Sequence, residues 1–298
     1  MNISPSSLFL GLAAFRSQTL ASLVGSSAGG KNDASWAAAF QEFSADGPST
    51  SPLSMLTQGS TIKGLAPTGR NLGLFDPESA YKMMSVINNN DVSYKAQFSL
   101  LSQMQSAVSQ MEGAGQSLGE ISGSTSNQTI ASQLQNFVGQ YNSWIERFTP
   151  DVQKGGLLAD TQAAQISRYE LDQSIKNPFN GAADGVHGMR DLGLTIDPNT
   201  RLAALDTGKL DSLLTSNRTG AINALQEFSA SFTKSASLLN SEGNFIPNRL
   251  NNLDRVIDYF ADHKRELQEE FGTGDAARPS GKIAQALAAY QQIYGAGA

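Results

Sequence analysis

The chain of 298 residues carries 27 acidic and 21 basic side chains, giving a formal net charge of −6 when both histidines are neutral. It contains no cysteine, which excludes a disulfide framework, a thiolate zinc site, an iron–sulfur cluster and a cysteine nucleophile. An acidic balance without a basic stripe argues against a dedicated nucleic-acid-binding protein, because such proteins need clustered lysine and arginine.

Residues 1–70 are rich in Ser, Gly and Pro and are predicted to form a flexible region. Aromatic residues at helical spacing indicate one short helix near residues 35–43. The longest apolar stretch, Leu8 to Phe15, is much shorter than the roughly 20 residues that span a bilayer. Because the first basic residue, Arg16, follows this stretch, we expect no cleavable signal peptide and no integral membrane segment. The alternative is an uncleaved export signal or an amphipathic segment that seeks a surface.

A long helix is predicted over residues 76–121. Asp76 is a good N-cap, and Pro77 and Glu78 suit the first helical turn. Apolar side chains then recur at steps of three and four along a narrow seam, which is typical of a helix that pairs with another helix. The seam residues expected to carry interactions are Tyr94, Phe98, Leu101, Met104 and Val108. The seam fades over residues 113–123, and a linker follows.

A compact central module of helices and one hairpin is predicted over residues 130–245. A wide aromatic stripe indicates a first helix that faces a true core and ends at residues 149–150, a Thr-Pro pair. A second helix is expected over about residues 161–176, with Asp160 as its cap. Gly, Pro and Asn content then predicts a loop over residues 177–188.

The β-hairpin is expected over residues 192–205. Two short extended runs flank residues 197–200, whose sequence Asp-Pro-Asn-Thr favours a turn. Asp206 should cap the helix that follows, and a further helix should carry the apolar series over residues 222–239.

The region 248–298 is predicted to contain a heptad helix, ending near residue 271, and a short terminal helix. The heptad spacing alternates between three and four over three heptads. The expected seam consists of Leu250, Leu253, Ile257, Phe260, Lys264 and Leu267, and it continues to Phe271. Lys264 is the polar member: either its ammonium group extends out of a loose seam, or it fixes register or stoichiometry. Tyr290 and Tyr294 of the terminal helix could face either a core or a partner.

Both narrow seams need a partner helix, so we predict that residues 77–112 lie antiparallel to residues 248–271. The predicted fold class is therefore mainly α with a small β-hairpin (α+β). Long coiled-coil-like helices near both ends bracket the compact helical and mixed module.

The central residues also carry an ordered series of motifs. In chain order these are FVxxYN at 137–142, GLLxD at 156–160, LGLTxD at 192–197, RL at 201–202, LD at 205–206, KL at 209–210 and LL at 213–214. The series resembles the C-terminal part of the flagellar filament-cap family, also called hook-associated protein 2. There the equivalents read F-V-x-x-Y-N, G-x-L-x-D, l-G-i-t-x-D, G-x-L-x-x-D and K-L-x-x-x-L.

This resemblance covers about residues 130–271, and residues 76–121 more loosely. Family members usually carry β-rich outer domains between these two parts, where this chain has only residues 122–129. The resemblance implies a secreted, oligomeric, structural protein of the bacterial flagellum, located outside the cell. Its implied partners are copies of itself and flagellin-like or hook-associated proteins. It does not imply the adhesion and filament-contact roles of the outer domains.

The alternative is an exported or cytoplasmic helical interaction module that shares the fold but caps no filament. An enzyme is not favoured. His187 and His263 each lack a second residue at metal-ligand spacing. Residues 274–282 lack the first Gly and the final Ser or Thr of a phosphate-binding loop. We therefore predict no catalytic, cofactor-binding or metal-binding residues, and no cofactor.

Overall fold

The computed structural model describes residues 62–176 and 185–295. The expectations for the short helix near residues 35–43 and for most of the loop over residues 177–188 lie outside this described part.

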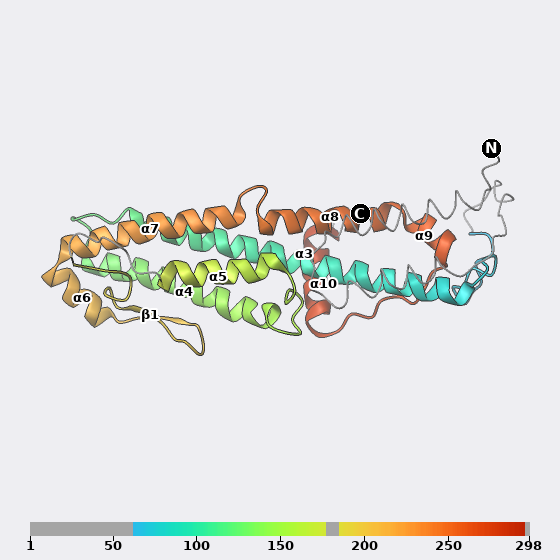
Figure 1. The fold of residues 1–298 in the computed structure, drawn as a ribbon, viewed down its shortest axis with the longest axis horizontal. Coiled ribbons are helices and arrows are strands. Elements are labelled where there is room, and N and C mark those ends of the chain that lie inside the picture. Colours follow the sequence, from blue (N-terminus) through green and yellow to red (C-terminus); the bar gives the residue numbers. More distant parts are fainter. Residues whose placement is uncertain (1–61, 177–184, 296–298) are drawn as a thin grey trace, which may run out of the picture. The chain divides into compact units, whose positions relative to one another are not determined.

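The described residues form two compact units. Unit 1 consists of residues 62–99 and 250–295, and unit 2 consists of residues 100–176 and 185–249. The division falls within α3, between Ser99 and Leu100, and within α8, between Arg249 and Leu250. The elements are α3 (Pro77–Gly119), α4 (Asn127–Val152), α5 (Gln162–Lys176), β1 (Leu194–Ile196), β2 (Ala203–Leu205), α6 (Thr207–Ser216), α7 (Arg218–Asn240), α8 (Phe245–Asp262), α9 (Lys264–Phe271) and α10 (Gly281–Tyr294) (Figure 1). The mainly α class with a small antiparallel hairpin is confirmed.

Helix starts follow from local side-chain chemistry. The carboxylate of Asp76 accepts a hydrogen bond from the Ser79 amide at 3.1 Å, and α3 begins at Pro77 as predicted. Asp206 accepts from the Lys209 amide at 2.9 Å and caps α6, also as predicted. Each cap satisfies a backbone N–H that lacks a partner within its helix.

The core of unit 2 is aromatic. Phe137 of α4 meets Phe228 and Phe232 of α7 edge-on, with ring centroids 5.2 Å and 4.8 Å apart. Tyr141 and Trp144 lie on the same face of α4 and are also buried. The aromatic stripe of this helix therefore faces a true core, as its width predicts.

The predicted end of this helix at residues 149–150 is wrong, because α4 continues through Pro150 to Val152. Proline lacks the N–H that would bond one turn back. In the last turn this removes a single hydrogen bond, and the Gln153 amide still donates to the Thr149 carbonyl at 3.1 Å. Pro150 therefore lies inside the helix without breaking it.

The start of α5 also differs from its prediction by one residue. The Gln165 amide donates to the Thr161 carbonyl, so Thr161 rather than Asp160 precedes the first helical residue. The Thr161 hydroxyl donates to the Leu158 carbonyl at 2.9 Å, which joins this corner to the preceding turn.

The hairpin is confirmed. Strand β1 pairs antiparallel with β2, with Leu194 opposite Leu205 and Ile196 opposite Ala203. The Asp197 carboxylate accepts backbone hydrogen bonds from residues 199 and 200 at 2.8 Å and 2.7 Å, which close the turn. These bonds favour the charged carboxylate and lower the pKa of Asp197 below its usual value.

Helix α7 packs antiparallel against the second half of α3 in unit 2. The Gln226 amide group donates to the Ile121 carbonyl at 2.8 Å, while that of Asn240 donates to Ser109 at 2.9 Å. The sequence predicts that the seam fades over residues 113–123, but in the structure the seam continues there. Small residues continue it and let α7 approach closely.

Gly115 and Gly119 make this approach possible. A Cβ atom on Gly115 would lie 2.9 Å from a ring carbon of Phe232, and one on Gly119 would lie 2.6 Å from the hydroxyl of Ser229. Gly115 is buried, whereas Gly113, half a turn earlier, is exposed and has open space around it. The two positions provide a matched pair of substitutions.

Gly115→Ala is expected to destabilise unit 2 by about 1–3 kcal/mol, because the added methyl group must displace the buried Phe232 ring. Gly113→Ala is expected to stabilise it by up to about 1 kcal/mol, because alanine has the higher helix propensity. Urea unfolding followed by circular dichroism measures both. Equal effects of the two substitutions would contradict the close approach of α7.

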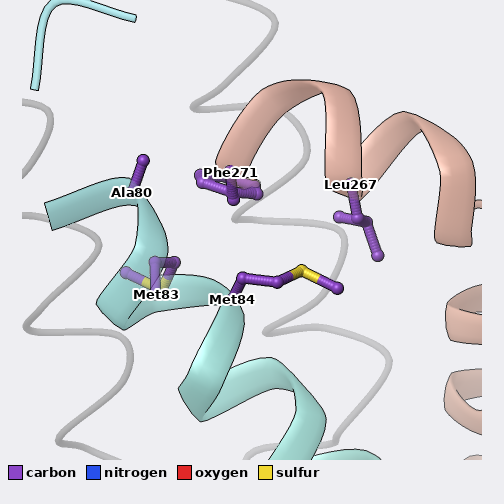
Figure 2. Packing of buried hydrophobic residues seen from close by; sticks show 5 residues of the cluster. All are labelled: Ala80, Met83, Met84, Leu267 and Phe271. Carbon is purple, nitrogen blue, oxygen red and sulfur yellow. The ribbon is translucent and has the colours of Figure 1, made fainter. Parts of the chain in front are cut away.

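In unit 1, the first half of α3 lies antiparallel to the end of α8 and to α9. The buried Ala80, Met83 and Met84 of α3 pack with Leu267 and Phe271 of α9. Figure 2 shows the Met84 side chain extending towards Leu267. Further along α3, Tyr94 stacks on Phe260 of α8 with ring centroids 6.3 Å apart. Because residue numbers rise along α3 as they fall along its partners, the predicted antiparallel pairing is confirmed within unit 1.

The predicted heptad helix is not continuous to residue 271. Helix α8 ends at Asp262, and α9 begins at Lys264. Between them His263 has φ −102° and ψ 14°, its ring stacks on Tyr259 with centroids 4.2 Å apart, and its Nδ1 lies 3.1 Å from the Tyr259 carbonyl oxygen. The helix is therefore interrupted at His263, although Leu267 and Phe271 beyond it keep the predicted heptad spacing and are buried.

Candidate assembly surfaces

The structure buries almost all of the predicted seam residues within the chain itself. Residues Tyr94, Phe98, Leu101, Met104, Val108, Leu250, Leu253, Ile257 and Leu267 are all buried, and Phe260 is partly buried. The first two and those from residue 250 onward belong to unit 1, and the remaining three belong to unit 2. These residues form intramolecular packing and do not present an open apolar stripe.

Lys264 is the exception among the predicted seam residues. It is exposed at the first position of α9, directly after the turn at His263. The interruption of the helix leaves this one position outside the seam, while Leu267 and Phe271, on the same heptad spacing, are buried. Within the chain, the ammonium group of Lys264 therefore does not interrupt an apolar contact.

The segment after α9, residues 272–280, is called here the strap. Its first residues form hydrogen bonds with α3 and with the residues that precede α3. The Thr273 amide donates to the Gly69 carbonyl at 2.8 Å, and the Asn88 side chain donates to the carbonyls of Thr273 and Asp275 at 3.0 Å and 2.8 Å.

Asp275 is the main attachment point of the strap. Its carboxylate accepts a hydrogen bond from the Tyr81 hydroxyl at 2.7 Å, and its amide donates to the Ser85 hydroxyl at 2.7 Å. The preceding Gly274 has φ 61°, and a Cβ atom there would lie 2.5 Å from the Ser85 nitrogen. Only glycine lets the strap lie so close to the α3 backbone.

Helix α10 covers the Phe98 side chain. Tyr290 and Tyr294 stack on each other, and both meet Phe98 edge-on with centroid distances of 5.9 Å and 5.3 Å. Phe98 is buried by these contacts, whereas Tyr294 remains 48% exposed and Ile293 60% exposed. The two tyrosines therefore contact the chain's own α3, and the outer edge of α10 remains apolar and open.

Carboxylates lie around the Tyr290 hydroxyl. Partial burial, together with Asp254 and Asp258 of α8 and Asp91 of α3, raises the pKa of Tyr290. Helix α10 itself contains no carboxylate, and its one charged residue is Lys282. Helix α10 therefore adds no negative charge next to these three carboxylates.

Other exposed apolar side chains lie ahead of α3, in unit 1. Leu72 is 66% exposed and Phe75 is 73% exposed. No periodicity marks them in the sequence, because they precede the helix, and sequence reasoning did not select them.

In unit 2, the motif residues hold the hairpin against α4. The Asn142 side chain donates to the Ala203 carbonyl at 2.9 Å and accepts from the Ala203 amide at 2.7 Å, so it pairs with β2 as a neighbouring strand would. Asp206 also donates its amide to the Gly193 carbonyl at 2.9 Å. These contacts give the residues of three motifs a structural role.

An ionic cluster around the buried Asp172 carboxylate holds the turn of the hairpin in place. The Asp172 carboxylate lies 2.8 Å from the Lys176 ammonium and 2.5 Å from the Arg201 guanidinium, and its side chain is 4% exposed. The Tyr141 hydroxyl donates to it over a long 3.5 Å. Burial and the nearby Asp172 carboxylate raise the pKa of Tyr141 far above its usual value, so this phenol stays protonated.

Arg201 adopts an unusual backbone conformation in this cluster. Its φ of 64° is the one positive φ of a residue other than glycine within residues 62–176 and 185–295. Arginine here accepts a left-handed backbone, and its side chain forms the ion pair.

Among the described residues, no three or more His, Cys, Asp or Glu side chains gather so that they could hold a metal ion. In the same part of the chain, none of the helices is both long and apolar enough to cross a bilayer.

Comparison with known proteins gives limited similarity. No protein-family model matches the chain, and no curated protein matches it. Partial similarity is found to the crystal structure of the D1–D2–D3 domains of the flagellar cap protein FliD from Escherichia coli. The two chains are 16% identical with a TM-score of 0.38, and the match covers 46% of this chain and 37% of that chain. The matched part spans less than half of either chain.

Proposed function

We propose that this chain is a non-enzymatic structural subunit that assembles with copies of itself, in the manner of a flagellar filament cap without outer domains. The observation that carries the proposal is the ordered motif series over residues 137–214, together with the structural role of its members. Phe137 and Tyr141 are core residues, Asn142 pairs with β2, and Asp206 caps α6. Residues with these roles specify a scaffold and leave no group placed for chemistry.

Assembly in this proposal uses surfaces other than the seams, because the chain's own helices cover the seams. The open apolar edge of α10 and the exposed Leu72 and Phe75 are available for contacts in unit 1. Partners would be further copies and flagellin-like or hook-associated proteins, in an extracellular location on the flagellum. These assignments follow from the sequence resemblance.

Two measurements test the proposal. Sedimentation equilibrium of the full chain over a wide concentration range should reveal an oligomer. Electron microscopy with gold-labelled chain should then place it at the ends of flagellar filaments that have been sheared to remove their native caps. Unsheared filaments serve as the control and should bind none at their ends.

The alternative, an interaction module that shares the fold, predicts self-association without binding to filament ends. A chain that stays monomeric at all concentrations and binds no filament would overturn both.

A further inference from the structure

Within unit 1, helix α10 has few buried side chains, and the residues that lead to it make few hydrogen bonds. Ala286 is its one buried residue, and its aromatic contacts are those of Tyr290 and Tyr294 with Phe98. By contrast, α3 and α9 share a cluster of five buried residues. On the α10 side of its contact one residue is buried, against two, Leu267 and Phe271, on the α9 side of the other contact.

In the connection to α10, Asp275 forms hydrogen bonds with α3, whereas the residues directly after it do not. Asp275 is bound to Tyr81, Ser85 and Asn88 of α3. The next four residues, 276–279, make no hydrogen bond in the described structure. Four residues in extended form reach roughly 13–14 Å, at 3.3–3.6 Å each. Release of α10 would leave the buried cluster that α3 and α9 share in place, because α10 contributes no residue to it.

We propose that α10 is exchanged between two copies of this chain, so that α10 of one copy covers Phe98 of the other. The receiving face is already matched to this occupant, because α10 contacts the same residues in its own chain. An exchanged helix makes equivalent contacts in the dimer, so exchange costs little beyond association. The absence of any carboxylate in α10 also suits the acidic rim of Asp254 and Asp258 on either copy.

The end of α10 stays open when the helix folds back on its own chain, because Ile293 and Tyr294 are exposed there. This inference rests on the proposed assembly function, and it identifies a second copy of the chain as the partner.

Residues 276–279, called here the hinge, provide the test. Deleting residues 276–279 from the full chain leaves α10 too short a connection to reach its own Phe98. Sedimentation velocity should then show a dimer, with the dimer dissociation constant lowered about tenfold or more relative to the natural chain. Inserting Gly-Ser-Gly-Ser after Ala277 should raise the monomer fraction instead. Phe98→Ala in the deletion variant should return it to monomer.

A second pair of variants keeps the test decisive if the deletion variant does not fold. Arg278 is exposed and makes no hydrogen bond in the described structure. Arg278→Pro places two prolines in succession and holds the hinge extended, which should favour the dimer, whereas Arg278→Gly should not.

Monomeric Arg278→Pro protein with an unchanged helical signal would overturn the exchange. A dimer that survives Phe98→Ala would also overturn it, and would leave the proposed assembly function standing through another surface. Failure of the proposed function would appear differently, as a natural chain that neither self-associates nor binds filament ends.

Discussion

Phe137→Ala is expected to lower the free energy of unfolding of unit 2 by about 3–5 kcal/mol, the range for removing a fully buried phenylalanine. Phe137 is 0% exposed and meets both Phe228 and Phe232 edge-on, so its ring joins α4 to α7. Truncation to alanine removes both aromatic contacts and leaves a cavity that the helix backbones cannot close.

Phe137→Leu is the control for this prediction. It keeps most of the apolar volume but loses the edge-to-face contacts, and it should cost about half as much or less. Urea unfolding can be followed by the fluorescence of Trp144, which lies two turns further along α4, in a Trp36→Phe background that removes the other tryptophan. A cost below about 1 kcal/mol for alanine would contradict the central place of this ring in the core.

The features that the sequence predicted correctly depend on neighbouring residues. Asp76 and Asp206 cap the helices that follow them because the amides they bind lie three residues on. The hairpin turn closes through bonds from Asp197 to residues two and three positions later. Such interactions are legible in a single sequence because both partners lie within one turn.

The features that were missed depend on residues far apart in the chain. In the sequence, Gly115 looks like a weak point of the seam. In the structure, the ring of Phe232, which lies 117 positions later in the chain (232 − 115), packs against it. The α10 tyrosines find Phe98 almost 200 residues away, and nothing local to either segment encodes that contact. A periodic pattern predicts which face is apolar but does not identify what covers it.

The assembly surfaces illustrate the same limit. The heptads predicted residues that need a helical partner, and within unit 1 the chain supplies that partner itself, through α8 and α9 for Tyr94 and Met84. Leu72 and Phe75 are among the apolar residues that remain exposed, and they follow no periodic pattern that would mark them in the sequence. Interaction residues of this kind can be recognised only when a structure shows which apolar residues are already covered within the chain.

Arg201 is the second position where a large effect is expected. Its guanidinium lies 2.5 Å from the Asp172 carboxylate, whose side chain is 4% exposed. Arg201→Ala leaves this buried carboxylate with Lys176 and a long hydrogen bond from Tyr141. Removing the guanidinium leaves a buried carboxylate that is poorly compensated, but the Arg201 side chain is itself 35% exposed, so we expect a loss of about 1–3 kcal/mol in unfolding free energy.

Arg201→Gly separates the ion pair from the backbone strain. Both variants lose the guanidinium, but at φ 64° alanine keeps the left-handed penalty of about 1–2 kcal/mol, whereas glycine relieves it. The glycine variant should therefore be about 1 kcal/mol more stable than the alanine variant, while remaining less stable than the natural chain. Urea unfolding of the three proteins, with fluorescence and circular dichroism compared, measures both differences. A glycine variant as stable as the natural chain would mean that the ion pair only offsets the strain that arginine introduces. Equal stabilities of the glycine and alanine variants would instead show that the left-handed backbone at this turn costs nothing.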